Sequence, residues 1–310
     1  MVMSSDGAKQ WVLGSVFGRA LISWRSRREL MQAARQNPEC VGTVANDQLA
    51  TLLVTRLPQP KTIFVDVGAH IGSIISEVAC QDPTVSVIAV EAMPDKAARL
   101  RKKFPAVTVH ASAVGERAGT VPFFVRPRQS GFSSLSKPAG QPASGPAEDV
   151  QEVQVPIQRL DELISAGGVD VMKIDVEGAE LGVLRGCPEM IAASRPVIMF
   201  ESGPRDADGL GYTKPLMWRF FSEHDYTLHI PNRVAHNDEG LSEDGFVDSH
   251  VYPRRTTNYI AIPRERRVAV RDRARAILRG TDEDSVSVDG ANGCRTRGNS
   301  LLTMDDVLLG

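Results

Sequence analysis

The sequence predicts an α/β protein with a mostly parallel sheet. Residues 63–67 form a short apolar run with β-branched members, typical of a strand buried on both faces. A glycine-containing turn from Gly68 to Gly72 and a helical pattern follow, so this stretch is a strand, turn and helix. Strand-like and helix-like stretches then alternate along the chain, and several of the strand-like runs end in an acidic residue.

The other elements follow from local periodicity and from proline and glycine. Further strands are predicted at residues 85–90, 107–114, 121–125, 153–157, 171–174, 196–200, 226–230 and 258–262. Helices are predicted at residues 46–57, 74–79, 94–101, 160–164, 177–186, 216–223 and 264–279. Pro58 and Pro60 end the first helix, Pro94 begins the third, and Asp161 is expected to cap the short fourth one.

Composition excludes several classes of protein. The chain has 310 residues, which is enough for one sizeable domain with appendages. Its net charge of −2 lacks the positive excess that is typical of proteins that bind nucleic acid. No apolar run reaches the roughly 18 residues that a membrane span needs. The four cysteines are widely separated, which favours free thiols in a reducing cytoplasm and provides no cysteine-based metal site.

Three segments are predicted along the chain. Residues 1–57 form an N-terminal helical extension, which packs on the domain or leads into it, with a membrane-interfacial helix as the alternative. Residues 58–263 form the main domain, interrupted at 126–150 by a loop rich in proline, glycine and serine that is a lid or an insertion. Residues 264–310 are a basic helix and a mobile tail, the helix being solvated or facing an anionic surface.

Asp66 decides which ligand suits the glycine turn. A carboxylate in the turn would repel a pyrophosphate and attract an ammonium or sulfonium group, and S-adenosylmethionine carries both. Glu91, at the end of the next strand, has the position of a carboxylate that binds two ribose hydroxyls. The alternative is an ordinary strand–helix–strand unit in which Asp66 is a helix cap.

Acidic residues follow four predicted strands. Because ligands of open α/β sheets bind beyond the carboxyl ends of the strands, Asp66, Glu91, Asp175 and Glu201 are expected to rim one crevice. Glu177 and Glu180 either add to its negative edge or stabilise the first turn of a helix.

The motifs together resemble the FkbM-type methyltransferases. The resemblance covers about residues 60–262, and its most specific part is the block Lys173-Ile-Asp-Val-Glu-Gly-Ala-Glu180. The others are Phe64-Val-Asp-Val-Gly-Ala-His-Ile-Gly72, Glu91, Gly131-Phe-Ser-Ser-Leu135, Arg159-Leu-Asp-Glu-Leu163 and Pro196-Val-Ile-Met-Phe-Glu201. It implies a class I, Rossmann-like fold, with a seven-stranded sheet covered by helices on both faces.

The resemblance also implies a cofactor site. Asp66, Gly68 and Gly72 would bind the methionine part of S-adenosylmethionine, Glu91 the ribose, and Ser112 and Ala113 would lie near adenine. His70 stands where the family often has asparagine and adds a titratable group beside the cofactor.

The expected activity is O-methylation of a small-molecule or glycan hydroxyl, on a sugar, polyketide or other natural product. Asp175 is the first candidate base, and it also lies beside the cofactor; Glu177 is the second. Other candidate bases are the histidines at positions 229, 236 and 250. Substrate contacts are expected from Phe132, Ser133, Ser134 and Glu201.

Three alternatives stay open at this point. Asp175 and Glu201 form a possible divalent-metal site, although no metal is expected. An NAD-type oxidoreductase is disfavoured by Asp66 and by the missing second glycine of the turn. A catalytically inactive binding protein on the same fold is the third alternative. The sequence leaves the oligomeric state open.

Overall fold

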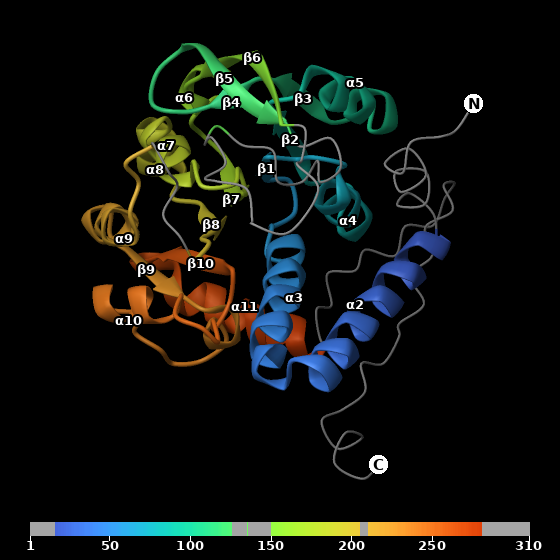
Figure 1. Cartoon of the computed structure of the whole chain (residues 1–310), viewed down its shortest axis with the longest axis vertical. Coiled ribbons are helices and arrows are strands. Elements are labelled where there is room, and N and C mark those ends of the chain that lie inside the picture. The colour runs from blue at the N-terminus through green and yellow to red at the C-terminus, as the bar shows by residue number, and fades with distance from the viewer. Residues whose placement is uncertain (1–15, 126–134, 136–149, 205–209, 281–310) are drawn as a thin grey trace.

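A seven-stranded sheet forms the centre of the protein (Figure 1). The computed structural model describes residues 16–125, 135, 150–204 and 210–280, without the side chains of residues 16–23. The strand order is β3-β2-β1-β7-β8-β10-β9. Neighbouring strands from β3 to β8 are parallel, and β10 is antiparallel to both β8 and β9. This confirms the expected mostly parallel, seven-stranded sheet.

The strand bounds agree with the predicted runs to within a few residues. They are β1 Ile63–Val67, β2 Ser86–Glu91, β3 Thr108–Ala111, β7 Val169–Ile174, β8 Val197–Glu201, β9 Tyr226–His229 and β10 Asn258–Pro263. Every residue of β7 is buried, as expected for a central strand of a parallel sheet.

Helices cover both faces of the sheet and form two apolar cores. One core contains side chains of α6 Leu160–Leu163, α7 Glu180–Arg185, α8 Pro188–Ser194, α9 Lys214–Glu223 and α10 Glu243–Asp248. The other contains side chains of α3 Val41–Arg56, α4 Ser73–Gln81, α5 Pro94–Lys103 and α11 Arg267–Arg279. Side chains alternate along β1, so Val65 packs into the first core and Phe64 into the second.

The strand predicted at residues 107–114 is divided between two sheets. β3 ends at Ala111, and β4 Ala113–Val114 belongs to a small sheet with β5 Gly119–Val125 and β6 Gln151–Gln158. Ser112 makes the division, because its N–H donates to Glu91 O of the main sheet at 3.1 Å and its hydroxyl donates to Pro156 O of the small sheet at 3.1 Å. The prediction of a single strand over residues 107–114 is therefore wrong.

Two further expectations are wrong. Asp161 does not cap its own helix, whose N-cap is Arg159. Its carboxylate accepts the N–H groups of Glu189 at 2.9 Å and Met190 at 3.0 Å, so it caps α8, a helix the periodicity did not predict. α7 begins at Glu180 rather than at Glu177, because Glu177 and Gly178 have φ values of 58° and 101°, which no right-handed helix contains.

Two helices far apart in the sequence, α3 and α11, meet at the sheet. α3 buries Ala50, Leu53 and Val54 in the core, whereas α2 Val16–Gln36 packs on α3 and extends away from the body (Figure 1). The Arg273 guanidinium on α11 donates to the carbonyl groups that end α3, those of residues 56, 57 and 58. No helix within the described residues is long and apolar enough to cross a membrane.

Candidate active site

A cavity of about 250 Å³ lies at the carboxyl ends of the central strands. Seven residues predicted for the site line it: Gly68, His70, Glu91, Ser112, Ala113, Asp175 and Glu177. Asp66, Gly72 and Glu201 are close to it without belonging to its lining. Phe132, Ser133 and Ser134, and most of the lid predicted at 126–150, lie outside the described residues.

Glu91 is the last residue of β2. It lines the cavity beside the turn that follows β1. Its two carboxylate oxygens accept the N–H groups of His70 at 2.8 Å and Met93 at 3.0 Å. Each oxygen retains capacity for a second hydrogen bond, which a pair of adjacent hydroxyls can use. Burial raises the pKa of Glu91, and the charge of Lys96 and these hydrogen bonds oppose that shift.

The glycine turn is shaped by close packing against other parts of the chain. Gly68 has φ +81°, and a Cβ there would lie 1.9 Å from the carbonyl oxygen of Asp175. Gly72 has φ +77°, and a Cβ there would lie 2.6 Å from the ring of Phe104. Gly68 is therefore required because β7 ends against the turn, and Gly72 because α5 packs beneath it.

Asp66 lies under the cavity floor and is neutralised by a buried lysine. The Lys173 ammonium is 3.2 Å from Asp66 Oδ1 and 3.4 Å from Asp175 Oδ2. Burial raises the pKa of Asp66, and Lys173 opposes this. Burial alone would lower the pKa of Lys173, but the charges of Asp175 and Asp66 outweigh it and raise that pKa. Asp66 therefore has its counter-ion within the protein.

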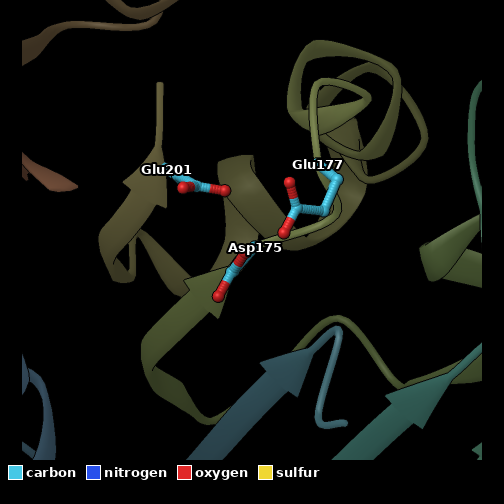
Figure 2. Close-up of side chains that lie close together, drawn as sticks. All are labelled: Asp175, Glu177 and Glu201. Carbon is cyan, nitrogen blue, oxygen red and sulfur yellow. The ribbon is translucent and has the colours of Figure 1, made fainter. Parts of the chain in front are cut away.

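Three carboxylates from two strand ends converge at the edge of the cavity. Glu201 extends from β8 toward Asp175, and Glu177 approaches from the turn after β7 (Figure 2). Oxygen atoms of these three side chains lie within 4.8 Å of one another. Burial, and then the charges of Asp175, Glu177 and Glu180, raise the pKa of Glu201 to about 10. Glu201 is therefore protonated at neutral pH and hydrogen-bonded to Asp175.

Glu180 stabilises the turn that carries Asp175. Its Oε1 accepts the N–H groups of Val176 at 3.0 Å and Gly178 at 3.1 Å. Burial raises the pKa of Glu180 to about 7, and these backbone hydrogen bonds oppose the shift. Of the two roles that the sequence left open for Glu180, the structure supports the stabilising one. The expected rim of four acids is therefore only partly correct. Asp66 lies beneath the cavity floor and not on its rim, and Glu177, which was not one of the four, belongs to the lining.

The opposite wall of the cavity is mostly apolar. Ala113, Val114 and Phe123 line it, together with Leu135. Phe123 was not predicted for the site, because a residue of the small sheet has no local sign that it faces the first sheet. Lys173 was not predicted for it either, although a lysine inside a strand buried on both faces is a visible signal.

The three histidines considered as candidate bases, at positions 229, 236 and 250, lie away from the cavity lining. His229 is buried and contacts Thr227 at 2.9 Å, and burial lowers its pKa to about 4. His250 is also buried; its Nδ1 donates to Phe246 O at 2.7 Å, and its Nε2 is 2.8 Å from Ser202 Oγ. His236 is exposed. Asp175 and Glu177 are therefore better placed than the histidines as bases for a ligand in the cavity.

The sequence is similar to that of a known methyltransferase. Methyltransferase 1 of Beauveria bassiana (strain ARSEF 2860) is 26% identical over 149 residues, which cover 42% of this chain and 60% of that protein. This match therefore spans three-fifths of the length of that relative.

Similar solved structures include two methyltransferases. A TehB-like SAM-dependent methyltransferase from Corynebacterium glutamicum ATCC 13032 has a TM-score of 0.36 and 13% identity, over 78% of this chain and 97% of that one. Precorrin-6y C5,15-methyltransferase from Geobacter metallireducens GS-15 has a TM-score of 0.34 and 17% identity, over 58% of this chain and 71% of that one.

The family assignment rests on the match to a family model. Residues 66–228, from the last part of β1 to β9, match the model of the Methyltransferase FkbM domain. They include the glycine turn, Glu91 and the acidic block after β7, and they make up more than half of the chain. The protein belongs to the FkbM methyltransferase family.

Proposed function

We propose that this protein transfers the methyl group of S-adenosylmethionine to a hydroxyl group of a small molecule or glycan. The observation that carries the proposal is that one cavity is lined both by Glu91 and by Asp175 and Glu177. A carboxylate suited to a ribose diol and carboxylates suited to deprotonating an alcohol thus share one space. Membership of the FkbM family supports methyl transfer over the hydride transfer of an NAD-type enzyme.

The residues of the cavity fit the parts of S-adenosylmethionine. Glu91 has acceptor capacity left for the two ribose hydroxyls. Ala113, Val114 and Phe123 provide an apolar wall for the adenine ring, and Ser112 lies beside them. Gly68 and His70 of the turn also line the cavity, and they would face the methionine part.

The chain's own contribution to the reaction is positioning and proton acceptance. When bound, S-adenosylmethionine supplies an activated methyl group on a positively charged sulfur. Asp175 would accept the proton of the acceptor hydroxyl, and Glu177 is the second candidate for that role. Glu201, protonated beside Asp175, would orient its carboxylate and contact the acceptor.

A divalent metal is the alternative use of the three acids. Their oxygen atoms are close enough to share one ion, and hard oxygen ligands suit Mg²⁺. Against it, the Lys173 ammonium already lies 3.4 Å from Asp175 and would repel a second cation there. We therefore favour the metal-free reaction.

Ligand binding and methyl transfer together test the proposal. Calorimetry should show binding of S-adenosylhomocysteine and none of NAD. Incubation with methyl-labelled S-adenosylmethionine and a panel of sugars, polyketide alcohols and lipids should then label a hydroxyl-bearing acceptor. Binding of NAD in place of S-adenosylhomocysteine would overturn the proposal. Cofactor binding together with label only on nitrogen or carbon would overturn the O-methyl part alone.

A further inference from the structure

The ammonium group of Lys173 contacts three separate parts of the site. Its Nζ donates to the carbonyl oxygen of Gly68 at 2.9 Å, and it lies 3.2 Å from Asp66 Oδ1 and 3.4 Å from Asp175 Oδ2. The ammonium thus makes one hydrogen bond, to the Gly68 carbonyl oxygen, and two ion pairs, with Asp66 and Asp175. Lys173 and Asp66 are partners in the parallel pairing of β7 with β1, which places the lysine between the two strand ends.

Exposure changes sharply across these three side chains. Asp66 is 1% exposed, Lys173 7% and Asp175 39%. The lysine therefore reaches from the buried floor of the site to a carboxylate on the cavity wall. Two of its three partners, Gly68 and Asp175, belong to the cavity lining.

A counter-ion for Asp66 would not need this geometry. Such a role requires one contact with one carboxylate, and the remaining donors could bind any nearby oxygen. Here they bind the turn proposed to hold the cofactor and the acid proposed to receive the acceptor proton. The same two segments also pack directly, because a Cβ on Gly68 would meet Asp175 O.

We propose that Lys173 is a positioning residue that holds the Gly68 turn and the Asp175 carboxylate at a fixed position relative to each other. The role assigned to Asp175 rests on the proposed function; the positioning of the turn does not. Lys173 touches neither reactant in this proposal. Its effect passes through the two groups it holds.

Two variants separate positioning from simple charge balance. Lys173→Met keeps a long, unbranched side chain but leaves Asp66 buried without a counter-ion, so we expect a large fall in the melting temperature. In Asp66→Asn/Lys173→Met both charges are gone, and most of that loss should be recovered. Lys103→Met is the matched control: Lys103 is a half-buried lysine that lies over the Phe104 ring at 4.8 Å.

Two measurements on the double variant decide the question. Hydrogen exchange of residues 66–72 and 175–178, without ligand, should be about tenfold faster than in the wild type, because the register of the two segments is loosened. Calorimetry should show S-adenosylhomocysteine binding at least about tenfold weaker. Lys103→Met should leave both unchanged.

The possible outcomes are distinct. If the double variant recovers wild-type exchange in both segments, Lys173 is only a counter-ion and the proposal fails. If exchange is faster but S-adenosylhomocysteine binds with wild-type affinity, the claim about the cofactor turn is wrong. If the wild type does not bind S-adenosylhomocysteine, the proposed function fails, and hydrogen exchange alone decides the role of Lys173.

Discussion

Gly68 and Asp175 approach each other so closely that a Cβ on Gly68 would lie 1.9 Å from the carbonyl oxygen of Asp175. We expect Gly68→Ala to lower the free energy of unfolding by about 3 kcal/mol or more, because the new methyl group must push the two strand ends apart at a positive φ. Chemical denaturation measures this. Gly280→Ala is the control: Gly280 has φ +66° and open space around it, so it should cost only about 1 kcal/mol. Equal losses in both variants would contradict the packing argument.

Glu91 is predicted to determine cofactor affinity. Glu91→Ala removes the acceptors for His70 and Met93 as well as those proposed for the ribose, so S-adenosylhomocysteine should bind roughly 100-fold more weakly. Calorimetry measures the affinity. Glu77→Ala changes another partly buried glutamate, on α4 outside the cavity lining, and should leave the affinity unchanged. The prediction fails if the two variants bind equally well.

Asp175 is predicted to matter for turnover more than for cofactor binding. Asp175→Asn keeps the shape of the side chain and removes its ability to accept a proton, so turnover should fall by about 100-fold or more. S-Adenosylhomocysteine affinity should change less than turnover does. The measurement is a labelled-methyl assay, run once an acceptor is found, alongside calorimetry. Full turnover in this variant would transfer the role of base to Glu177.

The raised pKa of Glu201 predicts a pH dependence of stability. The folded protein holds a proton on Glu201 up to a pKa of about 10, whereas the unfolded chain releases it near the ordinary glutamate pKa of 4.5. The protonated Glu201 therefore contributes to stability at low pH. This contribution is lost as the pH rises from the pKa of the unfolded chain to that of the folded protein. Glu201→Gln mimics the protonated form and should be more stable than the wild type at pH 9 by several kcal/mol, because each pH unit above the pKa of the unfolded chain costs about 1.4 kcal/mol.

The same pH series needs a control for general alkaline effects. Glu189→Gln changes an exposed glutamate on α8, and it should follow the wild-type curve of unfolding free energy against pH. If Glu201→Gln also follows that curve, Glu201 is ionised in the folded protein and the hydrogen bond to Asp175 is misassigned.

Mg²⁺ is predicted to have little effect on the protein at neutral pH. A metal at the three acids would have to displace the Glu201 proton and compete with Lys173 for Asp175. We expect millimolar Mg²⁺ to leave the melting temperature unchanged to within about 1 °C. A rise that occurs in the wild type and disappears in Glu201→Gln would establish the metal site instead.

Much of the fold follows from local patterns. The apolar runs of the central strands are short and bounded by proline, glycine or acids, so periodicity located all seven strands of the main sheet. It did not find the division at Ser112, because this depends on a hydrogen bond to the distant carbonyl group of Pro156. It also did not find α10, although Ser242 caps that helix locally. Asp161 does cap a helix, but it was assigned to the wrong one. Its partner α8 comes close to Asp161 only in the folded chain, so the sequence could not show this contact.

The sequence by itself determined the sheet, the family motifs and the acids that end the strands, because these features repeat at fixed short spacing. Only the tertiary structure decided which acid does what. Asp66, Asp175 and Glu201 look alike in the sequence, yet one is neutralised by Lys173, one faces the cavity and one holds a proton. Their charge states depend on burial and on neighbours from other strands, and those are set only when the strands come together.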